Sequence, residues 1–361
     1  MTHKRKILMI RLSAIGDVLF TLPAVTSWIG CHPGDQVTWL VEDKAAAILE
    51  HRQDLHEIIV YERARIRHLL KHPFRWPALI GLLAGHLGRI RKNVYDEVYD
   101  FQGNLKSAMH TLLARSGCKI GFDGNNSKEM SHLVYDRRVS PPKAAVHRVD
   151  KALALLFPTG HEQEIARPDL QIPGEVARRA QSVVQDLFPG IGGVHPLAVM
   201  HPGTSAFGAF KRWPAERFGL LALRLYDAFG LRTLITWGPG EEELADRAAG
   251  ASEGRAVVAP RTRSIVELAG LIAQATLFVA ADSGPLHLAN LMGIPCAALF
   301  GPKEPEVYKP YFRPCTVVTT GVCCSPCSVR RCDDPICMTG IDVDRVFDAS
   351  AALLKTTASQ P

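Results

Sequence analysis

The chain has 361 residues, enough for two ordinary domains, and its hydrophobic content of 47% is typical of a globular protein with a sizeable core. Lys and Arg (42) only slightly outnumber Asp and Glu (36), a balance that does not indicate a nucleic-acid-binding protein. The apolar run over 7–28 contains Arg11, Asp17 and Pro23, so it predicts neither a membrane-spanning helix nor a signal peptide.

Cationic residues are concentrated between Arg63 and Lys92. They are Arg63, Arg65, Arg67, His68, Lys71, His72, Arg75, Arg89, Arg91 and Lys92. This density is compatible with a surface for anionic lipid or for an acidic glycan, and equally with solvated helix faces.

Six of the nine cysteines lie between Cys315 and Cys337. An odd total without a signal peptide indicates a reducing, cytosolic compartment. Zinc could be held by Cys324, Cys327, Cys332 and Cys337, but their spacing is tighter than in zinc ribbons and fingers, which separate two pairs by a longer loop. We therefore expect reduced thiols packed in a loop, and no metal site.

Strands and helices are expected to alternate in both halves of the chain. In the first half, strands are predicted over 6–11, 36–41, 57–61 and 95–100, and helices over 18–28, 44–50 and a long region ending near residue 91. A polar, turn-rich segment over 160–175 predicts a linker, followed by a helix over 178–187. In the second half, strands are predicted over 197–200, 233–237, 275–279 and 295–302, and helices over 214–229, 241–249, 264–273, 286–292 and 343–355.

Repeated β-α units of this kind predict an α/β fold with two doubly wound, Rossmann-like domains facing a central cleft. We expect domains over 1–165 and 166–341. Residues 342–361 are expected to form a C-terminal helix that packs back on the first domain.

Polar residues follow the strands of both halves where ligands of parallel sheets bind. The segment Asp282-Ser283-Gly284-Pro285, followed by His287, ends a strand and opens a helix, where free amides and the helix dipole attract phosphate. Two earlier strand ends add Thr204 and Ser205, with Lys211 beyond them, and Glu241. Each turn alone could be a simple chain reversal, but three at successive strand ends predict a site for a phosphate-bearing nucleotide.

In the first half, Gly16 allows a tight turn and Asp17 opens the following helix. Asp17 could simply favour the helix dipole, or it could act as a general base that faces the nucleotide. Neither G-x-G-x-x-G after the first strand nor a Walker A motif is present, so a nicotinamide dehydrogenase is not expected.

Four segments together resemble glycosyltransferase family 9, the lipopolysaccharide heptosyltransferases, over nearly the whole chain. They are the opening stretch 7–24 with Ser13, Gly16 and Asp17; 99–107 with Gln102 and Asn104; 201–214 with Thr204, Ser205 and Lys211; and 282–289. The Cys-Ser-Pro-Cys stretch before Ile341 is also common in that family.

The resemblance implies a GT-B fold and an inverting, metal-independent transfer from ADP-L-glycero-D-manno-heptose, a substrate rather than a cofactor, to Kdo or heptose of the inner core. It implies Asp17 as general base and Lys211 as a catalytic group that holds the diphosphate. Donor contacts would come from Thr204, Ser205, Glu241, Asp282, Ser283, Gly284 and His287, and acceptor contacts from Ser13, Gly16, Gln102 and Asn104.

We expect a cytoplasmic monomer that works peripherally at the cytoplasmic face of the inner membrane, with no nucleic-acid partner. Two alternatives have different consequences. One is another GT-B enzyme that uses a different nucleotide sugar, which comparison of ADP, UDP and GDP binding would identify. The other is a non-catalytic protein that binds ADP-heptose. Such a protein would bind this donor but would form no product with an acceptor.

Overall fold

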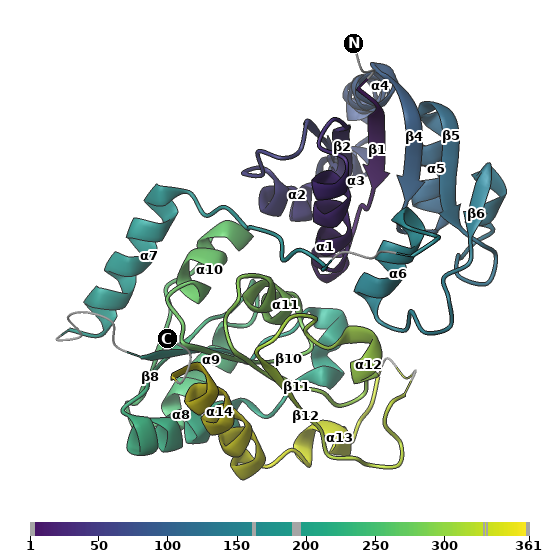
Figure 1. Cartoon of the computed structure of the whole chain (residues 1–361). Helices are drawn as coiled ribbons and strands as arrows, with labels where there is room; N and C mark the ends of the chain where they lie inside the picture. Colours follow the sequence, from purple (N-terminus) through teal and green to yellow (C-terminus); the bar gives the residue numbers. More distant parts are fainter. Residues whose placement is uncertain (1–3, 161–163, 190–195, 328, 330, 359–361) are drawn as a thin grey trace. The chain divides into compact units, whose positions relative to one another are not determined.

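The computed structural model describes residues 4–160, 164–189, 196–327, 329 and 331–358. The chain forms two compact units, Met1–Pro168 and Asp169–Pro361, each an α/β structure with its own sheet (Figure 1). Residues 161–163 of the predicted linker lie outside the described residues. The division between the units follows Pro168, three residues beyond the expected boundary.

The first unit alternates strands and helices from its beginning. Its elements are β1 (Lys6–Ile10), α1 (Ile15–Cys31), β2 (Gln36–Glu42), α2 (Asp43–Leu49), β3 (Glu57–Tyr61), α3 (Arg63–Leu70), η1 (Pro73–Arg75), α4 (Trp76–Arg91), β4 (Val94–Asp100), α5 (Leu105–Leu113), β5 (Arg115–Phe122), η2 (Ser131–Val134), β6 (Arg137–Val139) and α6 (Arg148–Leu156). The predicted strands over 6–11, 36–41, 57–61 and 95–100 are confirmed as β1 to β4.

The second unit repeats this alternation. Its elements are α7 (Gly174–Leu187), β7 (Leu197–His201), η3 (Ala206–Lys211), α8 (Ala215–Phe229), β8 (Arg232–Ile235), α9 (Glu242–Gly250), β9 (Ala256–Val258), α10 (Ile265–Ile272), β10 (Leu277–Ala281), α11 (Gly284–Leu291), β11 (Cys296–Leu299), α12 (Pro305–Tyr308), β12 (Cys315–Val318), α13 (Ile336–Thr339) and α14 (Val343–Ala358). The strands β9 and β12 have only three and four residues, which is too short for a sequence pattern that predicts a strand.

In the described residues, each sheet contains six parallel strands, and the two sheets share one strand order. The first is ordered β3-β2-β1-β4-β5-β6 and the second β9-β8-β7-β10-β11-β12. In both, the order reverses between two central neighbours, with Ile10 beside Asp100 in the first sheet and Ala280 beside His201 in the second. A parallel sheet binds its ligands beyond the carboxyl ends of the two strands at this reversal.

Apolar residues fill the strands at the centre of each sheet. Residues 7–10 of β1 and all of β10 are buried, as expected where helices cover both faces of a sheet. Trp39 and Trp213 are among the largest buried side chains of the two units. These cores hold the strand ends, and therefore the polar residues that follow them, in fixed positions.

The long helical region predicted to end near residue 91 is two helices rather than one. α3 ends at Leu70, and Pro73 begins the turn η1 before α4 starts at Trp76. Proline cannot donate the helical backbone hydrogen bond, so the chain changes direction there. The buried sides of the two helices then pack together through Ile66, Leu69 and Leu79.

The predicted C-terminal helix is α14, and it packs within the second unit. It contacts α8, β11 and β12 and adds Val346 and Leu353 to the core of that unit. Contact of this helix with the first unit stays a prediction. Among the described residues, none of the helices combines the length and the apolar character that crossing a membrane requires.

Candidate functional site

In the first unit, the predicted acceptor residues lie together where β1 and β4 end. The side-chain oxygen of Gln102, after β4, accepts hydrogen bonds from the backbone N–H groups of Leu12 and Ser13, after β1, at 3.0 and 3.1 Å. The Gln102 amide donates to Asn104 Oδ1 at 3.2 Å. Gln102 therefore ties the two strand ends together, and Gly16 and Asp17 follow in the first turn of α1.

The Asp17 carboxylate is held by an ion pair that sequence reasoning did not predict. Arg11 Nη2 lies 2.8 Å from Asp17 Oδ1, and Arg11 also donates to the carbonyl oxygen of Phe101 at 2.6 Å. The second carboxylate oxygen accepts from Ala14 N–H. The Asp17 side chain remains 34% exposed, so the carboxylate is fixed in orientation and still accessible from solvent.

A second charged group borders the same strand ends. Lys106, in the first turn of α5, forms an ion pair with the buried carboxylate of Glu42 and lies 3.4 Å from the Ser13 hydroxyl. Asn104 caps α5 by accepting from Ser107 N–H, so its side-chain oxygen serves the helix as well as Gln102. Neither Glu42 nor Lys106 was predicted, because only the tertiary structure brings them together.

In the second unit, the ends of β7 and β10 meet through Lys211 and Asp282. Lys211 Nζ donates to the carboxylate and the backbone carbonyl of Asp282, both at 2.8 Å, and His287 Nε2 lies 3.2 Å from the other carboxylate oxygen. Burial opposes ionisation of Asp282, but the His287 hydrogen bond and the Lys211 charge lower its pKa to about 2. Asp282 therefore stays ionised and holds the ammonium group in place.

Glu241 lies under the turns that follow β7 and β8. Its carboxylate accepts from Gly238 N–H at 2.9 Å and lies 3.4 Å from His201 Nε2. Burial raises the pKa of Glu241, but the His201 and Gly238 hydrogen bonds outweigh it and the net pKa is lowered. A Cβ at Gly203 would overlap this carboxylate, so a larger residue there would have to displace the Glu241 side chain.

The predicted phosphate-binding hydroxyls differ in their surroundings. Thr204 is buried, and its hydroxyl donates to the Gly208 carbonyl at 2.8 Å and accepts from Arg212. Ser205 is exposed. Ser283 occupies the N-cap of α11, with Gly284 and Pro285 opening the helix, and within the described residues its buried hydroxyl forms no hydrogen bond.

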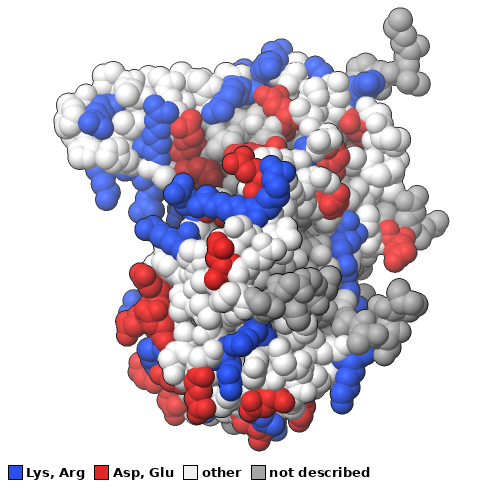
Figure 2. Space-filling model, turned by 90° about the vertical axis from the view of Figure 1, so that its left-hand side faces the viewer, with Lys and Arg blue, Asp and Glu red and all other residues white. Residues whose placement is uncertain are grey.

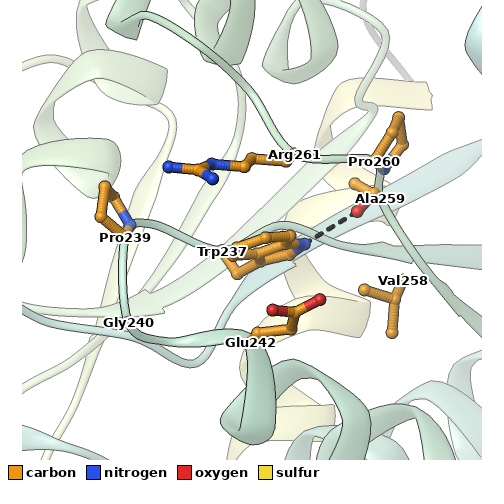
Figure 3. A pocket seen from close by; sticks show the side chains of 8 residues that line it. All are labelled: Trp237, Pro239, Gly240, Glu242, Val258, Ala259, Pro260 and Arg261. Atoms are coloured by element: carbon orange, nitrogen blue, oxygen red, sulfur yellow. Dashed lines mark hydrogen bonds between the residues drawn. The ribbon is translucent and has the colours of Figure 1, made fainter.

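A cavity of about 470 Å³ opens beside β8 and β9 (Figure 3). The Trp237 ring N–H donates to the Ala259 carbonyl at 2.8 Å, and the Arg261 and Glu242 side chains lie on opposite sides of the ring (Figure 3). Its lining is Trp237, Pro239, Gly240, Glu242, Val258, Ala259, Pro260 and Arg261. This cavity was not predicted from the sequence, although an aromatic residue, Trp237, immediately before the Gly238-Pro239-Gly240 turn could have indicated it.

The cysteine-rich segment shows no metal-binding arrangement in the part of the chain that is described. No group of three or more His, Cys, Asp or Glu side chains there is placed to hold an ion. Among the described residues, the six cysteines from Cys315 to Cys337 form no disulfide. Burial raises the pKa of Cys337, with smaller contributions from the neighbouring Cys324 and Cys327.

Comparison with known proteins identifies relatives of this arrangement. A family model described as glycosyltransferase family 9 (heptosyltransferase) matches residues 85–336. Lipopolysaccharide heptosyltransferase 1 of Pseudomonas aeruginosa is 29% identical to the chain, over 97% of the chain and 98% of the relative.

Solved structures of heptosyltransferases are also similar to the chain. E. coli heptosyltransferase WaaC with ADP matches with a TM-score of 0.70 at 28% identity, covering 86% of this chain and 92% of that one. WaaC with ADP-2-deoxy-2-fluoro heptose matches with a TM-score of 0.67 at 26% identity, covering 98% and 99%.

Fold, strand-end sites and relatives together define a glycosyl-transferring enzyme. The predicted class of fold is confirmed, because two Rossmann-like parallel-sheet domains with flanking helices match the GT-B heptosyltransferase structures. The chain belongs to glycosyltransferase family 9, the heptosyltransferases.

Proposed function

We propose that the chain transfers heptose from ADP-L-glycero-D-manno-heptose to Kdo or heptose of the lipopolysaccharide inner core, with inversion and without a metal ion. The donor is supported by the WaaC structures with ADP and with ADP-2-deoxy-2-fluoro heptose. The acceptor class is supported by the lipopolysaccharide heptosyltransferase 1 relative. Because this acceptor is a membrane glycolipid, the enzyme would work at the cytoplasmic face of the inner membrane. That it works there as a monomer is a separate part of the proposal.

The observation that carries the proposal is the charge at the two strand-order reversals. One holds the accessible Asp17 carboxylate, oriented by Arg11, and the other holds the Lys211 ammonium, oriented by Asp282. Glycosyl transfer needs both: a base for the acceptor and a positive charge for the leaving diphosphate. Each lies where parallel sheets bind ligands.

In the reaction we propose, the acceptor oxygen attacks the anomeric carbon while its proton passes to Asp17. The bond between that carbon and the diphosphate oxygen breaks, and ADP leaves with the bonding electrons. Lys211, the amides that open α11 and the Ser283 hydroxyl would stabilise the growing negative charge. Ser13, Gly16, Gln102 and Asn104 would position the acceptor.

The nucleoside would occupy the cavity beside β8 and β9. An adenine could stack on the Trp237 ring, and Arg261 could lie over it, as guanidinium groups do on aromatic systems. Glu242 lines this cavity, whereas the carboxylate of Glu241 lies beneath the neighbouring turns. Glu241 as the ribose ligand, and Thr204, Ser205, Asp282, Gly284 and His287 as donor contacts, remain part of the proposal.

Mass spectrometry of inner-core glycolipid incubated with the protein and ADP-heptose tests this function. We expect the acceptor to gain the mass of one heptose, in the presence of EDTA as well. Asp17→Asn should slow this gain by about 10²- to 10⁴-fold, the usual contribution of a general base, with ADP binding retained. Asp227→Asn, on the exposed side of α8, is the control. Normal turnover by Asp17→Asn would exclude Asp17 as the base.

A further inference from the structure

The surface formed by α3, η1 and α4, here called the α3–α4 surface, carries positive charge without any acidic residue. From Arg63 to Lys92 the sequence contains no Asp or Glu. Arg67, Lys71, Arg75, Arg91 and Lys92 are exposed, and within the described residues none of them has an acidic partner. In the upper left part of Figure 2, Lys and Arg side chains are separated by uncharged surface.

Large apolar side chains lie exposed on the same surface. Phe74 and Trp76, at the turn between the helices, are 76% and 52% exposed. Ile80 and Leu83 follow Trp76 at positions that share one face of α4, and they are 67% and 42% exposed. Leu79 is the buried residue of α4 that packs on α3, whereas Trp76, Ile80 and Leu83 stay exposed beside it and take no part in that packing.

The neighbouring helix α5, which contacts α4, also carries exposed apolar side chains. Leu105, Met109 and Leu112 repeat the same helical spacing, and all three are exposed. This helix begins at Asn104, in the acceptor cluster at the ends of β1 and β4. Exposed apolar side chains therefore lie at the Phe74–Trp76 turn, on α4 and on α5, the helix that begins at the proposed acceptor site.

We propose that the α3–α4 surface, together with α5, docks this protein on an anionic phospholipid membrane. Aromatic side chains that enter the headgroup region, flanked by Arg and Lys facing lipid phosphates, are the chemistry of an interfacial helix. A soluble acidic glycan would use the cations but would leave the Phe74, Trp76 and Ile80 side chains in water. The proposal deepens the proposed function, since it rests on the acceptor being a membrane glycolipid.

Sedimentation of the full-length protein with vesicles tests the proposal. We expect binding to vesicles containing phosphatidylglycerol, weaker binding at high salt, and much weaker binding to pure phosphatidylcholine. Phe74→Ser with Trp76→Ser should lower the partition coefficient by about tenfold or more, given the transfer free energy of an aromatic side chain. Lys71→Gln and Arg75→Gln should each lower it about fivefold.

Matched variants in the second unit are Leu220→Ser, an exposed apolar residue on α8, and Arg178→Gln, an exposed cation on α7. Both should bind vesicles as the wild type does. Circular dichroism and the ADP-induced thermal shift should be unchanged in every variant. Equal binding to anionic and neutral vesicles, or undiminished binding by the Phe74 and Trp76 variant, would overturn the proposal.

An acyl-free inner-core oligosaccharide separates this proposal from the proposed function. The Phe74→Ser, Trp76→Ser variant should glycosylate that soluble acceptor at the wild-type rate while failing to bind vesicles. If the wild type binds anionic vesicles but transfers no heptose to any acceptor, the proposed function fails and the docking surface stands. If the cationic variants lose the soluble oligosaccharide and keep vesicle binding, the surface recognises an acidic glycan and the membrane proposal is wrong.

Discussion

Three carboxylates illustrate how surroundings decide what one chemical group can do. Asp17 is partly exposed, with Arg11 on one carboxylate oxygen and the Ala14 N–H on the other. Asp282 and Glu241 are buried and surrounded by donors, which lower their pKa values against the effect of burial. A carboxylate so engaged is a poor proton acceptor, whereas Asp17 keeps an approach for a hydroxyl group. This contrast supports Asp17 as the base and Asp282 as the residue that positions Lys211.

Gly203→Ala tests how closely the donor turns are packed. Its new Cβ would displace the Glu241 carboxylate, so we expect a loss of about 1–3 kcal/mol in the free energy of unfolding, together with weaker ADP binding. Gly250, in the same unit, has open space at its Cβ position. Gly250→Ala should therefore be neutral or slightly stabilising in urea unfolding. Equal stability of the two variants would contradict the packing described at Glu241.

At the scale of the element, strands with continuous apolar sequences were predictable, because burial on both faces leaves an unmistakable pattern. β1 and β3 lie at or within one residue of their predicted bounds. The helical region predicted to end near residue 91 is divided into α3 and α4 around Pro73, because proline interrupts the backbone hydrogen bonds of a helix. β5, β6, β9 and β12 were not predicted, because short strands and strands of mixed polarity, such as Arg115–Phe122, depend on their neighbours for pairing rather than on their own hydrophobicity.

α4 is attached to its unit by a titratable side chain. His86 is buried against Tyr61 and His110, with ring centroids 5.1 and 5.3 Å apart, and burial followed by the charge of His110 lowers its pKa to about 4. In the unfolded chain the pKa is near 6.5, so the unfolded state binds more protons between these values. The stability that the neutral ring provides is present above pH 6.5 and is lost as pH falls towards 4.

Urea unfolding of His86→Phe at about pH 7 and about pH 5 measures this contribution. Between about pH 7 and about pH 5, the free energy of unfolding of the wild type should fall by about 2 kcal/mol more than that of the variant. The reason is that phenylalanine keeps the ring packing and cannot be protonated. His68→Phe, at an exposed position of α3, should retain the wild-type pH dependence. A wild type and a His86→Phe variant with parallel pH profiles would show that His86 is not buried as described.

At the scale of the whole molecule, two units with the same strand order divide the chemistry between them. The proposed base and acceptor residues belong to the first unit, and the proposed donor residues belong to the second. Each unit has its own core, so either cluster can keep its geometry independently. Closure of one ligand-bound unit on another is a common way to align two substrates and exclude water.

This division predicts where ADP protects the protein in hydrogen exchange. ADP should slow exchange in peptides that contain residues 201–212, 237–242 and 282–287, while peptides of β1 and β4 change far less. At an ADP concentration of about 100 times its dissociation constant, the free energy of unfolding should rise by about 2.7 kcal/mol. The Trp237→Ala variant should be stabilised less by ADP than the wild type is. UDP should stabilise the wild type less than ADP does. Stronger stabilisation by UDP would contradict the ADP-heptose assignment.

The amino-acid sequence by itself determined the α/β class, the two domains and the strand-end motifs, because apolar strands, glycine turns and helix-capping residues are local signals. It also placed Asp17, Lys211 and Asp282 at strand ends. Only the tertiary structure decided their partners, since the Arg11–Asp17 and Lys211–Asp282 pairs and the Trp237–Arg261 cavity depend on which strands are neighbours. The exposure of the apolar side chains on α4 could not be predicted from the sequence either. Hydrophobic periodicity predicts which side of a helix is apolar, but not whether another element covers that side.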